Sequence, residues 1–381
     1  MTRTLSTLNR LQTRLFSRSD GWIGIEMGCH CIHFAQVSKR ENRWQLSAIW
    51  SLEHPASELR ESNDPKRRTD EMFGWVARDE MFKNGLAKTL NTEDLRSLFL
   101  GRRCATTLTD GMIAYRELEL PSANPSEANE MVRSEIAIET DLDIEELVTD
   151  CWDLPQCDSR AGLCSFGAVS IKKTEVSHVA SSLLKAGFEC QTMDALPCAM
   201  ARSTAMVVTD PDTSTLAVDL GYQQATLTLV KAGRPVLSRE LRGLGVVSLL
   251  DQIADAFELS RSDAQTLLFQ PSSKAANDDP GKLAFSNPIH QYLSSFFQVL
   301  AAEIDKTIQF ATRAYRFAVP SQLLMMGAGS RICNVDRSME DRTGLSARFW
   351  SIDQSDSLFV DKPSSIYAVA AGLSTLAWEQ M

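Results

Sequence analysis

The chain has 381 residues, of which 39 are Lys or Arg and 49 are Asp or Glu, so its formal net charge is −10. This acidic surplus argues against nucleic acid as a partner, because binding to a phosphate backbone needs a basic face. No apolar run reaches the roughly 20 residues that cross a bilayer, which argues against a membrane-spanning protein. Nine cysteines without framework spacing indicate a reducing compartment, so the cytoplasm is the expected location.

Residues 1–19 contain four arginines and no acid, and their apolar residues fall close to helical spacing. The pattern predicts a basic amphipathic helix that contacts an anionic membrane surface or a partner protein. A solvated leader and an organelle transit peptide are the alternatives for the same composition.

After this segment, short apolar stretches alternate with turn residues and polar loops. The pattern predicts strands around tight turns over 21–37 and 43–51, a polar loop over 54–71, and helices over 79–90 and 92–98.

Residues 111–187 form a predicted module of their own. Periodicity predicts strands over 113–120, 147–152 and 163–171 and helices over 126–139 and 174–186. The order strand–helix–strand–strand–helix suggests a small open-faced sandwich that is inserted into a larger fold.

The second half starts a new series of strands and then becomes mostly helical. The predicted elements are a hairpin over 215–231, a strand over 235–239, helices over 245–257 and 261–269, a polar loop over 270–287, a long helix over 291–317, a strand over 322–326 that runs into a glycine turn, and a helix of small residues over 367–378.

Both halves begin with the same pattern, in which an acid between apolar residues is followed two positions later by Gly. The pairs are Glu26 with Gly28 and Asp219 with Gly221. Turns of this kind present backbone N–H groups, so two of them facing across a cleft can hold a phosphate chain while the acids hold Mg²⁺. This weak repeat predicts two α/β domains that face each other across a ligand site.

Further strings occur in a characteristic order along the chain. They are 116–121 before a Glu-rich helix, 187–188 leading to 193–195, the turn 327–331 followed by 343–345, and 367–373. Together with the basic leader and the two hairpins, their order resembles the PilM family of type IV pilus assembly proteins, which is similar to competence protein A and to FtsA. The resemblance spans nearly the whole chain. It implies an α/β, actin-like (ribonuclease H-like duplicated) two-domain fold with an inserted α+β subdomain.

On this resemblance, the first actin-like domain comprises 20–110 and 188–212, the inserted subdomain 111–187, and the second actin-like domain 213–381. The resemblance also implies the residues of an ATP site. The phosphate turns correspond to Glu26, Gly28, Cys29, His30, Asp219 and Gly221, and the adenosine-side turn to Gly327, Ala328, Gly329 and Ser330. Mg²⁺ would lie near Glu26 and Asp219. Glu303 and Lys306, one helical turn apart, correspond to a ribose-contacting or adenine-contacting pair, with a surface ion pair as the alternative.

Both phosphate turns depart from the family pattern. Cys29, His30 and Cys31 stand where small hydroxyl residues are usual, and 222–224 are Tyr-Gln-Gln where small residues are usual. Cys29, Cys31 and His33 share one face of a strand, so a metal site and plain buried cysteines are the alternatives to a degenerate nucleotide turn.

The resemblance implies a cytoplasmic scaffold, peripheral at the inner membrane, of a type IV pilus or a related secretion machine. Its partner would be the cytoplasmic N-terminal peptide of a PilN-like bitopic protein, and its cofactors ATP and Mg²⁺, with at most a weak ATPase activity. No catalytic residue is predicted. A nucleotide-free pseudo-actin scaffold and a small-molecule kinase of the same fold are the alternatives.

Overall fold

The computed structural model describes residues 20–28, 30–53, 98–107, 114–140, 142–154, 162–269, 280–354 and 363–379. The basic segment 1–19, the predicted elements between 54 and 97, and Cys29 lie outside the described residues. None of the described helices combines the length and the hydropathy that a bilayer-crossing helix requires.

The first sheet is built around the N-terminal hairpin. Its strands are β1 (Ile23–Met27), β2 (Cys31–Arg40), β3 (Arg43–Glu53), β4 (Arg103–Thr107), β8 (Glu189–Asp194) and β14 (Asp353–Gln354), in the order β14-β3-β2-β1-β4-β8. Glu41 and Asn42 join β2 to β3 with φ of 47° and 63°. Positive φ at both central residues is the conformation of the tight turn that matches strand twist.

The second sheet repeats this topology. Its strands are β9 (Ser214–Leu220), β10 (Gln224–Lys231), β11 (Arg234–Arg242), β12 (Gln322–Met326) and β13 (Ser346–Phe349), in the order β11-β10-β9-β12-β13. In each sheet the first strand pairs antiparallel with the next strand in sequence and parallel with a later one. The duplication that the two acid–glycine patterns predict is therefore present in the strand order.

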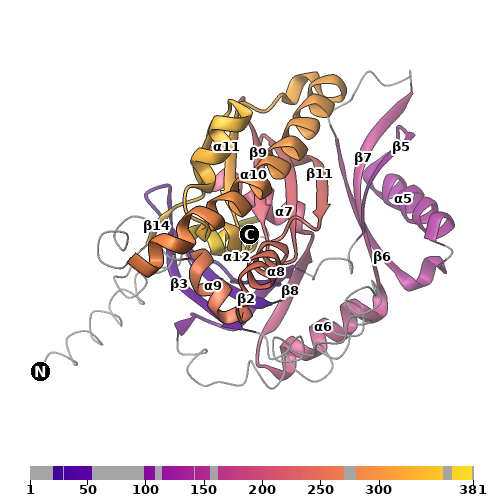
Figure 1. The fold of residues 1–381 in the computed structure, drawn as a ribbon. Coiled ribbons are helices and arrows are strands. Elements are labelled where there is room, and N and C mark those ends of the chain that lie inside the picture. The colour runs from indigo at the N-terminus through magenta and orange to yellow at the C-terminus, as the bar shows by residue number, and fades with distance from the viewer. Residues whose placement is uncertain are drawn as a thin grey trace, which may run out of the picture.

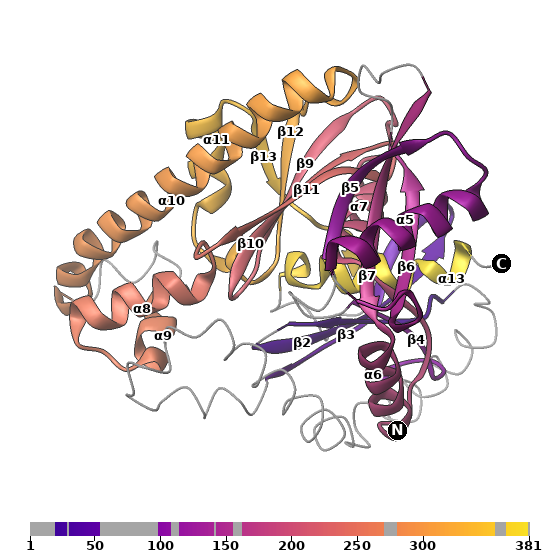
Figure 2. The ribbon, with the colours of Figure 1, turned by 90° about the vertical axis from the view of Figure 1, so that its right-hand side faces the viewer.

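Helices cover the outer face of the second sheet. They are α8 (Val246–Phe257), α9 (Arg261–Phe269), α10 (Pro280–Ala314) and α11 (Val335–Thr343), and Figure 2 shows α10 running along this side. Helix α10 starts at Pro280, inside the stretch 270–287 that composition predicts as a loop, and ends at Ala314 rather than at 317. Proline suits a first helical turn, where its missing N–H has no intrahelical partner.

The inserted module is a three-stranded sheet with one covering helix, and it lies to one side of the molecule (Figure 1). Strands β5 (Ala114–Pro121), β7 (Leu163–Lys172) and β6 (Leu147–Asp153) pair in the order β5-β7-β6, and α5 (Pro125–Thr140) packs on them. Helix α6 (Lys173–Lys185) instead buries Val179 and Leu183 against the first sheet. The domain bounds stay a prediction.

The last described segment fills the space between the two sheets (Figure 2). It comprises the short helices η9 (Ser364–Tyr367), α12 (Ala368–Ser374) and α13 (Leu376–Glu379), so the helix predicted over 367–378 is interrupted at Thr375. Helix α12 packs between β1 and α7 (Leu196–Val207), and a Cβ on Gly24 would lie 1.8 Å from the carbonyl oxygen of Ala370. Part of the range 213–381 therefore packs against the first half.

Candidate functional site

The two predicted turns lie in one cavity of about 350 Å³ between the halves. Seven of the twelve predicted site residues line it: Glu26, Gly28, His30, Asp219, Gly221, Gly327 and Ala328. The pattern of acid and glycine in the sequence thus identifies side chains that the fold brings together from opposite halves.

The two glycines close their turns in the same way. Gly28 N–H donates to the carbonyl of Cys31 at 3.1 Å, and a Cβ on Gly28 would lie 2.7 Å from that oxygen. A Cβ on Gly221 would lie equally near, at 2.7 Å, to the carbonyl oxygen of Gln224. Since real Cβ contacts are longer than this, any other residue at either position would push the turn open.

The two acids lie at the ends of the strands that lead into these turns. Asp219 is 6% exposed, and the chain at Gly327, with φ of 83°, passes so close that a Cβ there would lie 2.0 Å from Asp219 Oδ1. Glu26 lines the same cavity from β1. Mg²⁺ binds through one or two carboxylates together with water, so this pair of acids suits that ion.

The described residues give no support to a metal site at the cysteines and histidine of the first turn. Within the described ranges, no group of three or more His, Cys, Asp or Glu side chains is placed to hold a metal ion. Cys31 Sγ and His33 Nδ1 are 3.9 Å apart, and the third member of the predicted set, Cys29, is outside those ranges.

A ring contact joins the two turns across the cavity. The His30 imidazole stacks on the Tyr222 ring with centroids 4.1 Å apart and planes 12° from parallel. Stacked rings at this separation are in van der Waals contact, so nothing fits between them. The acids fit Mg²⁺, but the turns in this arrangement do not fit a phosphate chain between them.

The remaining predicted residues have packing and ion-pair roles. Ser330 Oγ donates to the carbonyl of Gly327 at 2.7 Å, and a Cβ on Gly329 would collide with Leu220. Glu303 contacts Arg239 at 2.5 Å and Lys306 at 2.6 Å, and these pairings lower the pKa of its carboxyl. Neither Glu303 nor Lys306 is among the side chains that line the cavity.

A hydrogen-bonded chain on the cavity wall is not visible in the sequence. Ser51 Oγ lies 2.9 Å from His33 Nδ1 and 2.8 Å from the hydroxyl of Tyr367, and all three residues line the cavity. Burial raises the pKa of Tyr367, so its hydroxyl stays neutral and can bond. Ser51 and Tyr367 are 316 positions apart, and no local pattern marks either of them.

A second cavity, of about 790 Å³, lies between the inserted module and the first half. It is lined by five consecutive residues of β6, 148–152, and five of β8, 190–194. Because successive side chains of a strand point to opposite faces, a cavity lined by five in a row lies along the edge of the strand. We call this cavity the edge groove.

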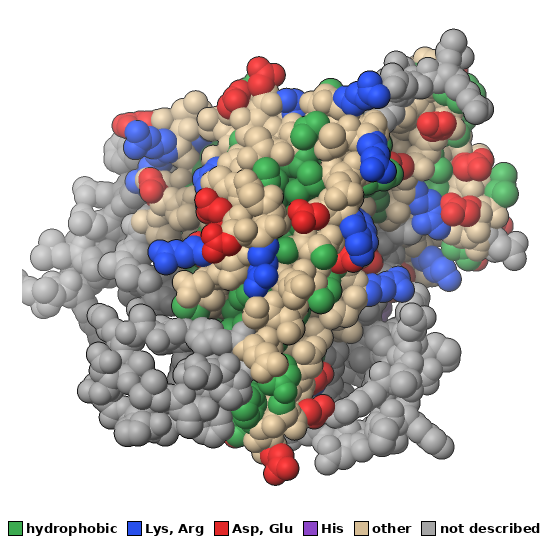
Figure 3. Space-filling model, turned by 45° about the horizontal axis from the view of Figure 1, so that its top comes forward, with side chains coloured by type: hydrophobic (Ala, Val, Ile, Leu, Met, Phe, Trp, Pro, Cys, Tyr) green, Lys and Arg blue, Asp and Glu red, His purple; other side chains and the backbone are tan. Residues whose placement is uncertain are grey.

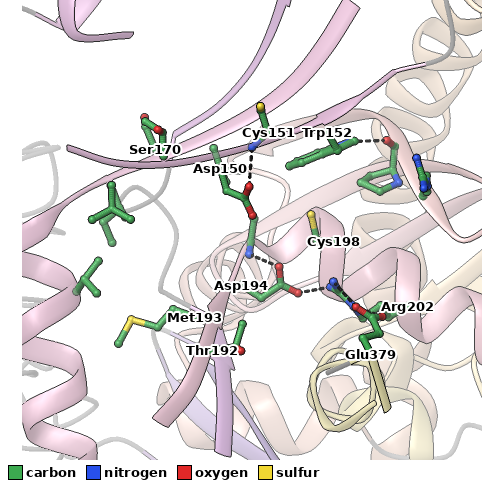
Figure 4. Close-up of a pocket in the computed structure, with 18 of the residues that line it drawn as sticks. Asp150, Cys151, Trp152, Ser170, Thr192, Met193, Asp194, Cys198, Arg202 and Glu379 are labelled. Atoms are coloured by element: carbon green, nitrogen blue, oxygen red, sulfur yellow. Dashed lines mark hydrogen bonds and ion pairs between the residues drawn. The ribbon is translucent and has the colours of Figure 1, made fainter. Parts of the chain in front are cut away.

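Each of these strands ends its sheet on the groove side. In the part of the chain that the structure describes, β6 and β8 have no further strand beyond them. On β6, Asp150 Oδ1 accepts the N–H of Cys151 at 2.9 Å; directly after β8, Asp194 Oδ1 accepts the N–H of Ala195 at 2.9 Å (Figure 4). The edge amide of Cys151 is thus held by a side chain instead of a strand.

The groove also contains a partly buried ion-pair cluster. Arg202 of α7 contacts Asp194, whose side chain is 13% exposed, and donates from Nε to Glu379 at 2.8 Å. Burial raises the pKa of Asp194 to about 6, against the opposing effect of the Arg202 charge. Three carboxylates and two guanidinium groups line the groove, so acid is in excess: Asp150, Asp194, Glu379, Arg202 and Arg234.

The second half forms the far wall of the groove. Trp152 Nε1 donates to the carbonyl of Pro235 at 3.3 Å, and the β10–β11 turn together with the start of β11 contributes residues 232–235 to the lining. Elsewhere, the Tyr315 hydroxyl contacts Glu117 of β5. The inserted module therefore contacts the second half at two places.

The surface shown in Figure 3 carries Lys and Arg side chains interspersed with Asp and Glu. On this face, the described residues form no extended basic area of the kind that binds a phosphate backbone.

A scan against family models and a search of curated proteins found no match for this sequence. Solved structures do match. One described as a "PilM-PilN type IV pilus biogenesis complex" aligns with a TM-score of 0.69 and 20% identity, over 94% of this chain and 98% of that chain. The ethanolamine utilization protein EutJ from Carboxydothermus hydrogenoformans aligns with a TM-score of 0.51 and 10% identity, over 94% of this chain and 90% of that chain. The resemblance to PilM is confirmed at the level of the fold: the chain has the two-domain, actin-like α/β fold.

Proposed function

We propose that this protein is a scaffold of a type IV pilus or related secretion assembly machine, and that it holds the cytoplasmic N-terminal peptide of a PilN-like bitopic protein in the edge groove. The observation that carries the proposal is that two strand edges, β6 and β8, face one groove. The fold match to a protein solved in a PilM–PilN complex adds support. The scaffold would lie in the cytoplasm at the inner membrane, where residues 1–19 contact lipid.

An extended peptide suits this groove because it can pair with an exposed strand edge through its backbone while alternate side chains enter pockets. On binding, a peptide carbonyl accepts the Cys151 N–H in place of Asp150. The released Asp150 carboxylate then pairs with a basic side chain of the peptide. Cytoplasmic segments next to a membrane span carry an excess of Lys and Arg, which matches the acidic surplus of the groove.

ATP with Mg²⁺, which the fold family implies, would have Glu26 and Asp219 as its metal ligands. The proposed scaffold function uses no chemical step at this site. A small-molecule kinase would need two open phosphate turns, and the contact between His30 and Tyr222 disfavours them. The nucleotide-free form of the scaffold is therefore the form that the geometry favours.

The test is binding of a fluorescent peptide from the cytoplasmic tail of a PilN-like protein, followed by anisotropy. Asp150→Arg reverses the charge that faces the groove, and we expect a dissociation constant about tenfold higher, equivalent to about 1.4 kcal/mol. Asp153→Arg is the matched control, because Asp153 lies on the same strand and outside the groove lining. Equal effects of the two variants, or no binding to the unaltered chain, would contradict the proposal.

A further inference from the structure

We propose that the stacked pair of His30 and Tyr222, here called the ring clamp, takes the place of the nucleotide phosphates and holds the two halves together without a ligand. The inference goes beyond the scaffold function, because it concerns the cavity between the halves and not the edge groove. It rests on the geometry of four residues, namely the two rings and the two glycines that shape their turns.

The ring clamp lies where a phosphate chain would have to pass. His30 lies two positions after Gly28 and Tyr222 directly after Gly221, so each ring is presented by the turn whose amides would bind phosphate. The ring centroids are 4.1 Å apart and the planes 12° from parallel, which is direct contact across the cavity. A phosphate chain between these turns would have to separate the rings first.

The turns are also held rigidly behind the rings. Gly28 N–H donates to the carbonyl of Cys31 at 3.1 Å, and on the other side the N–H of Val247 donates to the carbonyl of Tyr222 at 2.8 Å. Helix α8 therefore fixes the backbone that carries Tyr222, and the hairpin of β1 and β2 fixes the backbone beside His30. With both backbones held, the rings separate only if a side chain changes its rotamer or the two halves move.

The charge of the cavity matches this assignment. Glu26 and Asp219 are both acidic, and among the residues described as lining the cavity Arg331 is the one Lys or Arg. Its guanidinium lies 4.3 Å from the centroid of the Phe269 ring. An anionic chain between the turns would meet two carboxylates and no lysine, whereas the two rings bring no negative charge to this place.

The ring clamp would keep the angle between the two halves the same whether or not nucleotide is present. In a chain of this fold with open turns, ligand binding would select one arrangement of the halves. Here the side chains of the protein make the bridging contact, so the scaffold keeps one arrangement whatever the nucleotide concentration.

The test combines amide hydrogen exchange with thermal unfolding of the full chain. Tyr222→Ala removes the ring, and we expect exchange of the Gly28 and Val247 amides to become about two- to tenfold faster, the range expected for loss of one aromatic pair. Tyr222→Phe keeps the ring, so its exchange should equal that of the unaltered chain. Tyr292→Ala, which removes a ring packed on Phe257 within the second half, should leave both amides unchanged.

In the same preparations, freed of nucleotide, millimolar Mg-ATP should leave the melting temperature of the unaltered chain where it was, because a ligand that binds the folded state must raise it. Stabilisation of the unaltered chain by Mg-ATP would overturn the proposal, and so would unchanged exchange in Tyr222→Ala. Neither readout involves the partner peptide, so failure of peptide binding in the edge groove would leave this test intact.

Discussion

The buried carboxyl of Asp194 makes stability depend on pH in a direction opposite to that of an ordinary ion-paired acid. Its pKa is raised from 3.8 to about 6 in the folded chain, chiefly by burial. The folded state therefore binds this proton more tightly than the unfolded state does. The stabilisation is fully present below the unfolded pKa and is lost as the pH rises through the folded pKa.

The size of the effect follows from the two pKa values. Full protonation stabilises the fold by about 3 kcal/mol relative to the ionised form, since one pKa unit corresponds to about 1.36 kcal/mol. From the linkage between protonation and folding, Asp194 contributes about 1.4 kcal/mol to the free energy of unfolding at pH about 5 and about 0.1 kcal/mol at pH about 7. The unaltered chain should thus lose about 1.3 kcal/mol from this group between those two conditions.

Asp194→Asn removes the titration and keeps a side-chain oxygen for the N–H of Ala195. We measure the free energy of unfolding with urea at both pH values. Between pH about 5 and pH about 7, its decrease should be about 1.3 kcal/mol smaller in the variant than in the unaltered chain. Asp153→Asn, at an exposed acid of β6, controls for the loss of one negative charge. An equal pH response in Asp194→Asn and the unaltered chain would refute the reasoning.

Three further variants test the packing. Gly24→Ala places a Cβ against the backbone of α12, so we expect a loss of about 1–3 kcal/mol in chemical unfolding, and a variant as stable as the parent would contradict the close approach. Tyr367→Phe removes the hydroxyl that bonds Ser51, and thermal unfolding should show a loss of about 0.5–1.5 kcal/mol. Glu303→Gln breaks an ion pair with Arg239, and chemical unfolding should show a cost below about 1 kcal/mol; a cost well above this value would contradict the assignment of Glu303 to a surface ion pair.

The duplicated architecture could be predicted because its signals are local. Alternating apolar residues and tight turns mark the hairpins, and the acid–glycine pairs at Glu26 and Asp219 mark equivalent strand ends in both halves. The sequence therefore predicted both turns and also their location at one cavity. The start of α10 at Pro280 could not be predicted, because composition alone does not distinguish a polar helical turn from a loop.

The contacts on which the two proposals rest depend on tertiary placement. The stacking of His30 on Tyr222 joins residues from opposite halves. The sequence shows that larger residues stand where small ones are usual in these turns, but it does not show that their rings are in contact. The edge groove forms because the inserted sheet is held with β6 along β8, and no local pattern specifies that arrangement. Glu303 keeps helical spacing to Lys306 and forms an ion pair with it, but neither residue is among those that line the cavity.

The packing of α12 has a consequence for the order of folding. The N–H of Val37 donates to Ser374 Oγ, 337 residues later in the chain, and the same hydroxyl donates to the carbonyl of Trp22. All seven residues of α12 are buried, several of them against β1 and β2. During synthesis on the ribosome, the first hairpin therefore waits with one apolar face uncovered until nearly the whole described chain has been made. Such long-range closure slows folding and leaves a nascent intermediate for chaperones to protect.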